Sequence, residues 1–147
     1  MLSKYFSPYL GLAAIATLVA VPVLAHTVEV SGDVAATFHL DPSHNPRVGQ
    51  STQAWFALTQ RGGARIPLSQ CDCALAVYSR PRGNAPILQP TLRQVNGDRY
   101  QNIPGATMVF PSVGSYDLVL TGRAINGATF RPFTLTYRVN VGSIPIM

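Results

Sequence analysis

The chain has 147 residues, with 11 basic and 6 acidic side chains and a net charge of +5. Apart from Lys4 every basic residue is an arginine, and the arginines are scattered without a block, which argues against a nucleic-acid partner. If the first 25 residues are removed as a leader, the remaining length suits one domain with a single core and excludes two.

The first 25 residues have the pattern of a signal peptide. Lys4 gives a positive start, residues 10–20 form an uncharged apolar run, and a small-residue cleavage site ends at Ala25. An uncleaved membrane anchor is the alternative, but the apolar run is shorter than the ~20 residues that a spanning helix needs. We therefore expect an exported protein of the periplasm, a lumen or the extracellular space. Its single domain spans 26–147, and it meets a membrane only if the leader is retained.

From residue 27 onward, short alternating runs of apolar and polar residues are interrupted by Gly, Pro, Asn and Asp, which is typical of an all-β protein. Strands are predicted at 27–31, 34–40, 51–59, 65–68, 71–79, 106–110, 115–121 and 130–141, with an edge strand around 87–95. A set of about seven strands with this spacing predicts an immunoglobulin-like β-sandwich.

Two predicted strands carry the clearest packing signals. Trp55, the single tryptophan, is expected to be the largest anchor of the core. In the 115–121 strand Tyr116 and Leu118 should point inward, with the Tyr116 hydroxyl tying down a neighbouring loop. Asp117 alternates with them, so we expect it to face solvent.

Residues 80–104 are predicted to be a long, polar, proline-rich connection, which in a compact domain makes a candidate binding loop. Arginine and tyrosine are enriched at protein interfaces. The candidate partner-binding residues are Arg80, Arg82, Arg93, Arg99 and Tyr100. A solvated loop without a partner is the alternative.

The order of motifs resembles a known group of exported domains. A proline-rich loop ends at Gly49, an aromatic strand contains Trp55, and Ile66-Pro67-Leu68 and Phe110-Pro111-x-x-Gly114-x-Tyr116 follow. This order resembles the secreted YtkA-like and CopC-like immunoglobulin-fold domains over most of the mature chain. The resemblance implies an exported small β-sandwich, in some members a copper carrier that uses the mature N-terminal histidine.

His26 matches that position, because cleavage after Ala25 would make it the first residue. Its amine and imidazole could chelate one metal ion, and a second imidazole would give the nitrogen-rich, roughly planar set that Cu(II) prefers. The remaining imidazoles are His39, on the outward face of the 34–40 strand, and His44, in the loop that follows. The later Asp-x-His pair of the copper-binding relatives is missing here. Ordinary surface histidines are the alternative.

Cys71-Asp72-Cys73 is the second candidate metal site. Three interpretations remain open: a local disulfide in an oxidising compartment, a soft thiolate site for Cu(I) or Zn, and two buried reduced cysteines. Cysteines two apart on a strand have Cα atoms ~6.6–6.8 Å apart, so a bridge would bend the strand. The spacing is not that of a Cys-x-x-Cys redox motif or a structural zinc site.

An enzymatic function is not expected. The sequence contains no Gly-x-Ser-x-Gly elbow and no phosphate-binding glycine loop, and its acidic residues are spread singly. The sequence therefore predicts an exported, non-enzymatic binding module with copper as its ligand. The alternative is a metal-free protein-interaction module that uses the 80–104 loop.

Overall fold

The computed structural model describes residues 16–19 and 27–146. The elements in chain order are β1 (Thr27–Ser31), β2 (Val34–Asp41), β3 (Ser51–Gln60), β4 (Arg65–Ile66), the 3-10 turn η1 (Leu68–Gln70), β5 (Cys71–Ser79), β6 (Arg93–Gly97), β7 (Tyr100–Val109), β8 (Gly114–Ala124) and β9 (Phe133–Val141). The described part of the chain contains no helix long and apolar enough to cross a membrane.

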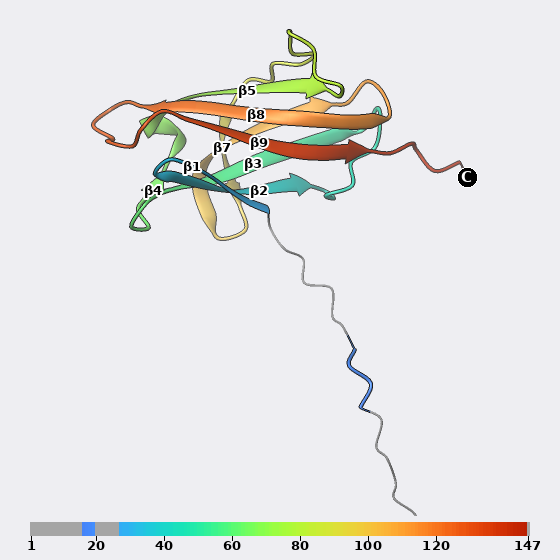
Figure 1. Cartoon of the computed structure of the whole chain (residues 1–147), viewed down its shortest axis with the longest axis horizontal. Coiled ribbons are helices and arrows are strands. Elements are labelled where there is room, and N and C mark those ends of the chain that lie inside the picture. The colour runs from blue at the N-terminus through green and yellow to red at the C-terminus, as the bar shows by residue number, and fades with distance from the viewer. Residues whose placement is uncertain (1–15, 20–26, 147) are drawn as a thin grey trace, which may run out of the picture.

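The strands form two antiparallel sheets that face each other as a β-sandwich (Figure 1). The first sheet has the order β1-β2-β3-β7-β6, with β4 paired to β3, and the second has the order β5-β8-β9. All-β architecture is therefore confirmed. Of the predicted leader the structure describes only residues 16–19, and His26, where the domain is predicted to start, lies outside the described residues.

The core lies between the sheets because strands such as β2 and β9 turn alternate apolar residues inward. In β2 the buried residues are Val34, Ala36, Phe38 and Leu40. The Phe38 ring stacks on Tyr137 of β9, with centroids 4.5 Å apart, and the Tyr137 hydroxyl donates to the carbonyl of Ala36. These contacts join the two sheets.

The prediction for Tyr116 is confirmed. Its side chain is buried, and its hydroxyl donates to the carbonyl of Ser112 at 2.6 Å, which ties the turn before β8 to that strand. The prediction that Asp117 is exposed to solvent is wrong. The carboxylate does lie on the outer face of β8, but the residue is only 3% exposed because Arg80 and Arg138 cover it.

Two further predictions need correction. Trp55 is buried, but with Ala57 and Ile103 it forms a small second cluster, separate from the main core between the sheets. The 80–104 segment is not one long loop, because β6 begins at Arg93 and β7 at Tyr100. The predicted edge strand around 87–95 is shifted, with Leu88 making only an isolated bridge to Val77.

Candidate functional site

The candidate site lies on the outer face of the first sheet, at the end of β2. Because β2 alternates, its buried residues leave His39 and Asp41 on the opposite face. His39 pairs with Trp55 of β3 across the sheet, and their rings stack with centroids 4.8 Å apart. The predicted outward orientation of His39 is therefore confirmed.

Four side chains form a continuous chain of polar contacts at this position. Trp55 Nε1 donates to Asp41 Oδ2 at 3.2 Å, and His39 Nε2 lies 2.9 Å from Asp41 Oδ1. The loop after β2 then brings His44 back, so that its Nε2 is 2.9 Å from Nδ1 of His39. The structure thus brings together two of the three predicted histidines.

This arrangement fits a neutral His39 that carries its proton on Nε2. If Nε2–H of His39 donates to the Asp41 carboxylate, Nδ1 keeps its lone pair and accepts the proton of His44 Nε2. A carboxylate that accepts from the second ring nitrogen of a histidine commonly orients that ring toward a metal ion. Sequence reasoning missed Asp41, although its position two residues after His39 on a strand places both on one face.

The Trp55 ring, on which His39 stacks, is itself held in place by its neighbours. Gly97 of β6 lies so close that a Cβ there would stand 2.7 Å from Trp55 Nε1, so only glycine leaves room for the indole. Tyr100 packs on the same cluster, with its ring centroid 5.6 Å from that of Trp55. The β6–β7 hairpin therefore covers the ring on which His39 rests.

The third predicted histidine, His26, lies outside the described residues. It directly precedes Thr27, and Thr27 is paired with Phe38 in the β1–β2 ladder. Among residues 16–19 and 27–146, no group of three or more His, Cys, Asp and Glu side chains is arranged to hold a metal ion.

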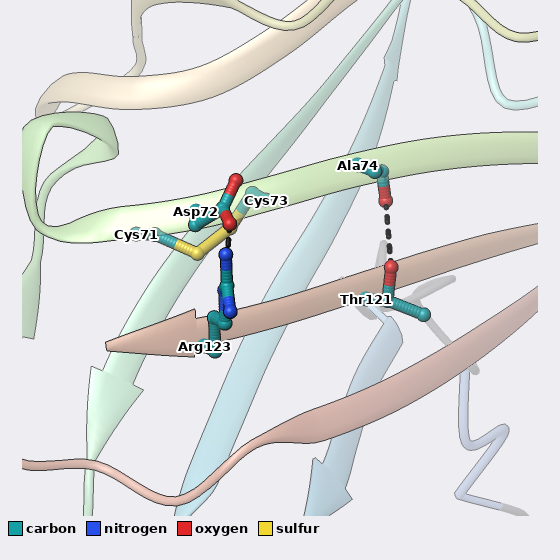
Figure 2. The surroundings of a disulfide bond; sticks show 6 residues. All are labelled: Cys71, Asp72, Cys73, Ala74, Thr121 and Arg123. Atoms are coloured by element: carbon teal, nitrogen blue, oxygen red, sulfur yellow. Dashed lines mark hydrogen bonds and ion pairs between the residues drawn. A yellow bond between two sulfur atoms is a disulfide. The ribbon is translucent and has the colours of Figure 1, made fainter. Parts of the chain in front are cut away.

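Cys71 and Cys73 are joined by a disulfide (Figure 2), with Cα atoms 5.2 Å apart. Of the three interpretations, the local disulfide is the one found, and the strand is contracted at this point as expected. The bridged sulfurs are not thiolates, and they belong to the second sheet, whereas His39 and His44 belong to the first sheet and the loop after β2. The structure does not bring the two candidate metal sites together.

The five candidate partner-binding residues separate into two groups. Arg80 pairs with the buried Asp117 at 2.8 Å, and Arg82 lies over the Tyr78 ring, 4.2 Å from its centroid. Arg93, Arg99 and Tyr100 belong to the β6–β7 hairpin. Arg65 and Arg99 both lie over the Tyr100 ring, at 4.8 and 5.6 Å.

Comparison with known proteins shows similarity of fold alone. No known protein family matches the sequence, and no curated protein does. A solved DUF4426 family protein from Pseudomonas aeruginosa PAO1 is 9% identical with a TM-score of 0.51, covering 78% of this chain and 96% of that one. FetP from uropathogenic Escherichia coli strain F11, crystallised after recombinant expression in the E. coli periplasm, is 10% identical with a TM-score of 0.59, covering 82% and 96%.

Proposed function

We propose that the protein is an exported, non-enzymatic, immunoglobulin-like module that binds copper through His26, His39 and His44. The observation that supports the proposal best is the approach of two imidazole nitrogens, Nδ1 of His39 and Nε2 of His44, to 2.9 Å. Export and removal of residues 1–25 are part of the proposal, as is the resemblance to YtkA-like and CopC-like domains.

The distance between these nitrogens suits a planar metal site. Imidazole nitrogens bind metal ions at about 2.0–2.1 Å, so two that are bound at right angles lie about 2.8–3.0 Å apart. A copper ion could replace the shared proton if each ring turned by about 45°, because the ion would lie off the line that joins the two nitrogens. Asp41 supports the same geometry because it holds Nε2 of His39 and leaves Nδ1 as the ligand atom.

His26 would supply the remaining nitrogens. If the β1–β2 pairing of Thr27 with Phe38 continued by one residue, position 26 would stand opposite His39. Cleavage after Ala25 would add a free amine beside the His26 imidazole. Three imidazoles and one amine make the nitrogen-rich set to which Cu(II) binds more tightly than other divalent first-row ions.

The test begins with the mature protein as it is exported. The chain is expressed with its own leader, its N-terminal residue is determined, and Cu(II) is titrated while absorption spectra and mass are followed. We expect one tightly bound ion, lost in His26→Ala and His44→Ala and weakened when an alanine is added before His26. One-to-one binding that survives His39→Ala and His44→Ala together would contradict the proposed site.

A protein-interaction module is the second candidate, and the clustering of cations around Tyr100 is the observation that favours it. Arg93 lies on the neighbouring strand of the same hairpin. A protein partner that is crosslinked to the exported chain should be lost in Arg99→Glu and retained in His44→Ala. The copper proposal expects the reverse for metal binding, so the two functions are separated by the same pair of variants.

A further inference from the structure

The Cys71–Cys73 disulfide contributes little to holding its strand. The two residues are separated by only two positions in sequence, and a bridge that closes so short a loop constrains the unfolded chain least. β5 is held instead by its ladder with β8, which is continuous from Cys71 opposite Ala124 to Ser79 opposite Tyr116. The disulfide can therefore open without loss of the strand, so a structural role explains it poorly.

The two sulfurs differ in accessibility. Cys71 is 4% exposed, and its Sγ fills the space beside Gly122, 2.7 Å from where a Cβ on that glycine would stand. Cys73 is only half-buried. An attacking thiolate would therefore reach Cys73, with Cys71 as the leaving sulfur, because exchange requires access to the sulfur that is attacked.

A groove of about 560 Å³ opens beside the disulfide. Its lining includes both cysteines and several apolar side chains: Cys71, Cys73, Leu68, Leu75, Pro90 and Leu92. Figure 2 shows that Asp72, between the cysteines, extends to Arg123 of β8, where Arg123 Nε is 2.7 Å from its carboxylate. Asp72, on the face of β5 opposite the cysteines, is thus already paired, and it does not line the groove, whose lining is both polar and apolar.

The backbone at this groove is an open strand edge. β5 is the first strand of the second sheet, and Val77 uses its outer N–H and C=O with Leu88 and Ile87. The alternation of an antiparallel ladder turns the N–H and C=O of Cys73 and Leu75 toward the same edge. No strand in the described part of the chain pairs with β5 there, so an extended peptide could add to it.

We propose that Cys71–Cys73 is a thiol–disulfide exchange site for an extended, dithiol-bearing segment of a partner protein. A thiolate of the partner attacks Sγ of Cys73, the bond to Cys71 breaks, and Cys71 keeps the electron pair and takes up a proton. The partner's second thiolate then attacks its own sulfur in the mixed disulfide, and Cys73 leaves and is protonated. Two electrons pass to this chain, and the partner's dithiol becomes a disulfide.

The proposal is independent of copper, because the disulfide and the histidines belong to different parts of the sandwich. The test uses reduced glutathione as the thiol and the oxidised full-length protein, quenched in acid and mapped by mass spectrometry. We expect a mixed disulfide on Cys73 that exceeds any adduct on Cys71 by more than about tenfold, as accessibility requires. Adducts on Cys71, equal adducts on both, or reaction only in denaturant would overturn the proposal.

A second experiment tests whether the thiol reaches Cys73 through the groove, by filling the groove with a large side chain. Thr91 is exposed and lines the groove, so Thr91→Trp should slow adduct formation about tenfold or more by blocking access to the sulfur, whereas Thr91→Ser should not. Circular dichroism checks that both variants keep the β fold. If adduct formed at the same rate in folded wild-type protein and in folded Thr91→Trp, the incoming thiol would not approach through the groove. The wild-type mapping decides the matter if Thr91→Trp does not fold.

Discussion

Asp41 contacts two aromatic rings at once, through one carboxylate oxygen each. In Asp41→Asn only one amide oxygen remains to accept, so either His39 or Trp55 loses its acceptor. If the histidines bind copper, the substitution should lower the affinity about 10–100-fold, which is the usual cost of losing a partner that orients a ligand. Copper titration of the mature variant measures this.

The control for this prediction is Asp98→Asn, in the exposed turn of the β6–β7 hairpin, where asparagine tolerates the positive φ of 51°. It should leave the copper affinity unchanged. Circular dichroism distinguishes a lost ligand geometry from a lost fold. Equal affinities for Asp41→Asn and the wild type would show that Asp41 does not position His39 for a metal.

Tyr137 couples stability to alkaline pH. Burial, with a smaller contribution from the charge of Glu29, raises the pKa of its hydroxyl well above the ordinary value of 10.0. The unfolded chain therefore loses this proton at lower pH than the folded chain. The stabilisation is complete below pH 10 and should decline as the pH rises above about 10.

Tyr137→Phe tests this coupling. At pH 7 the variant should lose about 0.5–1.5 kcal/mol, because the hydrogen bond to the Ala36 carbonyl is gone. Above pH 10 the loss of stability with pH should be shallower than in the wild type, since the phenyl ring cannot ionise. Urea unfolding from neutral to alkaline pH measures both effects, and parallel pH curves would refute the assignment.

The sequence pattern predicts some contacts of the candidate site and not others. Alternation along β2 was enough to predict that His39 faces outward, and the same period places Asp41 beside it. The approach of His44 to His39 depends on the path of the loop after Asp41, which no periodic pattern encodes. The contact with Trp55 depends on the pairing register of β2 and β3.

At the scale of elements, the β6–β7 hairpin was predictable and was missed. Asn96-Gly97 lies between two runs that can form strands, and Asn-Gly is a strong hairpin signal. Gly97 pairs with Tyr100, so the loop contains only Asp98 and Arg99, and the Asn-Gly signal would have placed the turn two residues too early. The high content of polar residues and proline from residue 80 onward concealed the hairpin because it suggested one long connection.

In β8, the alternation of apolar and polar residues predicts which face a side chain lies on but not whether it is buried. The pattern correctly places Asp117 on the face opposite Tyr116 and Leu118, but a face is exposed only if nothing covers it. Here the long side chains of Arg80, directly after β5, and of Arg138 in β9 reach across to it. Such coverage comes from neighbouring strands, so the sequence of β8 alone could not predict the burial of Asp117.

The two arginines should therefore differ in their effect on stability. Arg80 NH1 is 2.8 Å from Asp117, whereas Arg138 Nε is 3.6 Å away. Arg80→Met leaves a buried carboxylate poorly compensated and should cost about 1–3 kcal/mol. Arg138→Met should cost less than about 1 kcal/mol, because its side chain is largely exposed. Urea unfolding compares them, and equal costs would contradict this ranking.

At the scale of the whole molecule, two sheets around one core followed from the strand count and from the inward apolar residues. The order of strands within the sheets could not be predicted in this way. β3 pairs with β7, and β5 with β8, through contacts between residues far apart in sequence. Such pairing depends on turns and packing that single strands do not specify.

Asp33 joins separate parts of the sandwich at one end. Its Oδ1 accepts from the backbone N–H of Arg131 at 3.0 Å, just before β9, and its carbonyl accepts from Arg61 N–H at 2.7 Å, just after β3. One residue in the β1–β2 turn therefore links the two sheets. Because Asp33→Ala leaves the Arg131 N–H without this acceptor, the substitution should cost about 1–2 kcal/mol of unfolding free energy.

Asp33→Asn keeps an acceptor oxygen and should recover most of that stability. Asp72→Ala is the control, because it breaks only an exposed pair with Arg123 and should cost less than about 1 kcal/mol. Urea unfolding of the three variants gives the ranking, and hydrogen exchange should show faster opening near Arg131 in Asp33→Ala. If Asp33→Ala were no less stable than Asp72→Ala, the Asp33 carboxylate would contribute nothing measurable to holding the two sheets together.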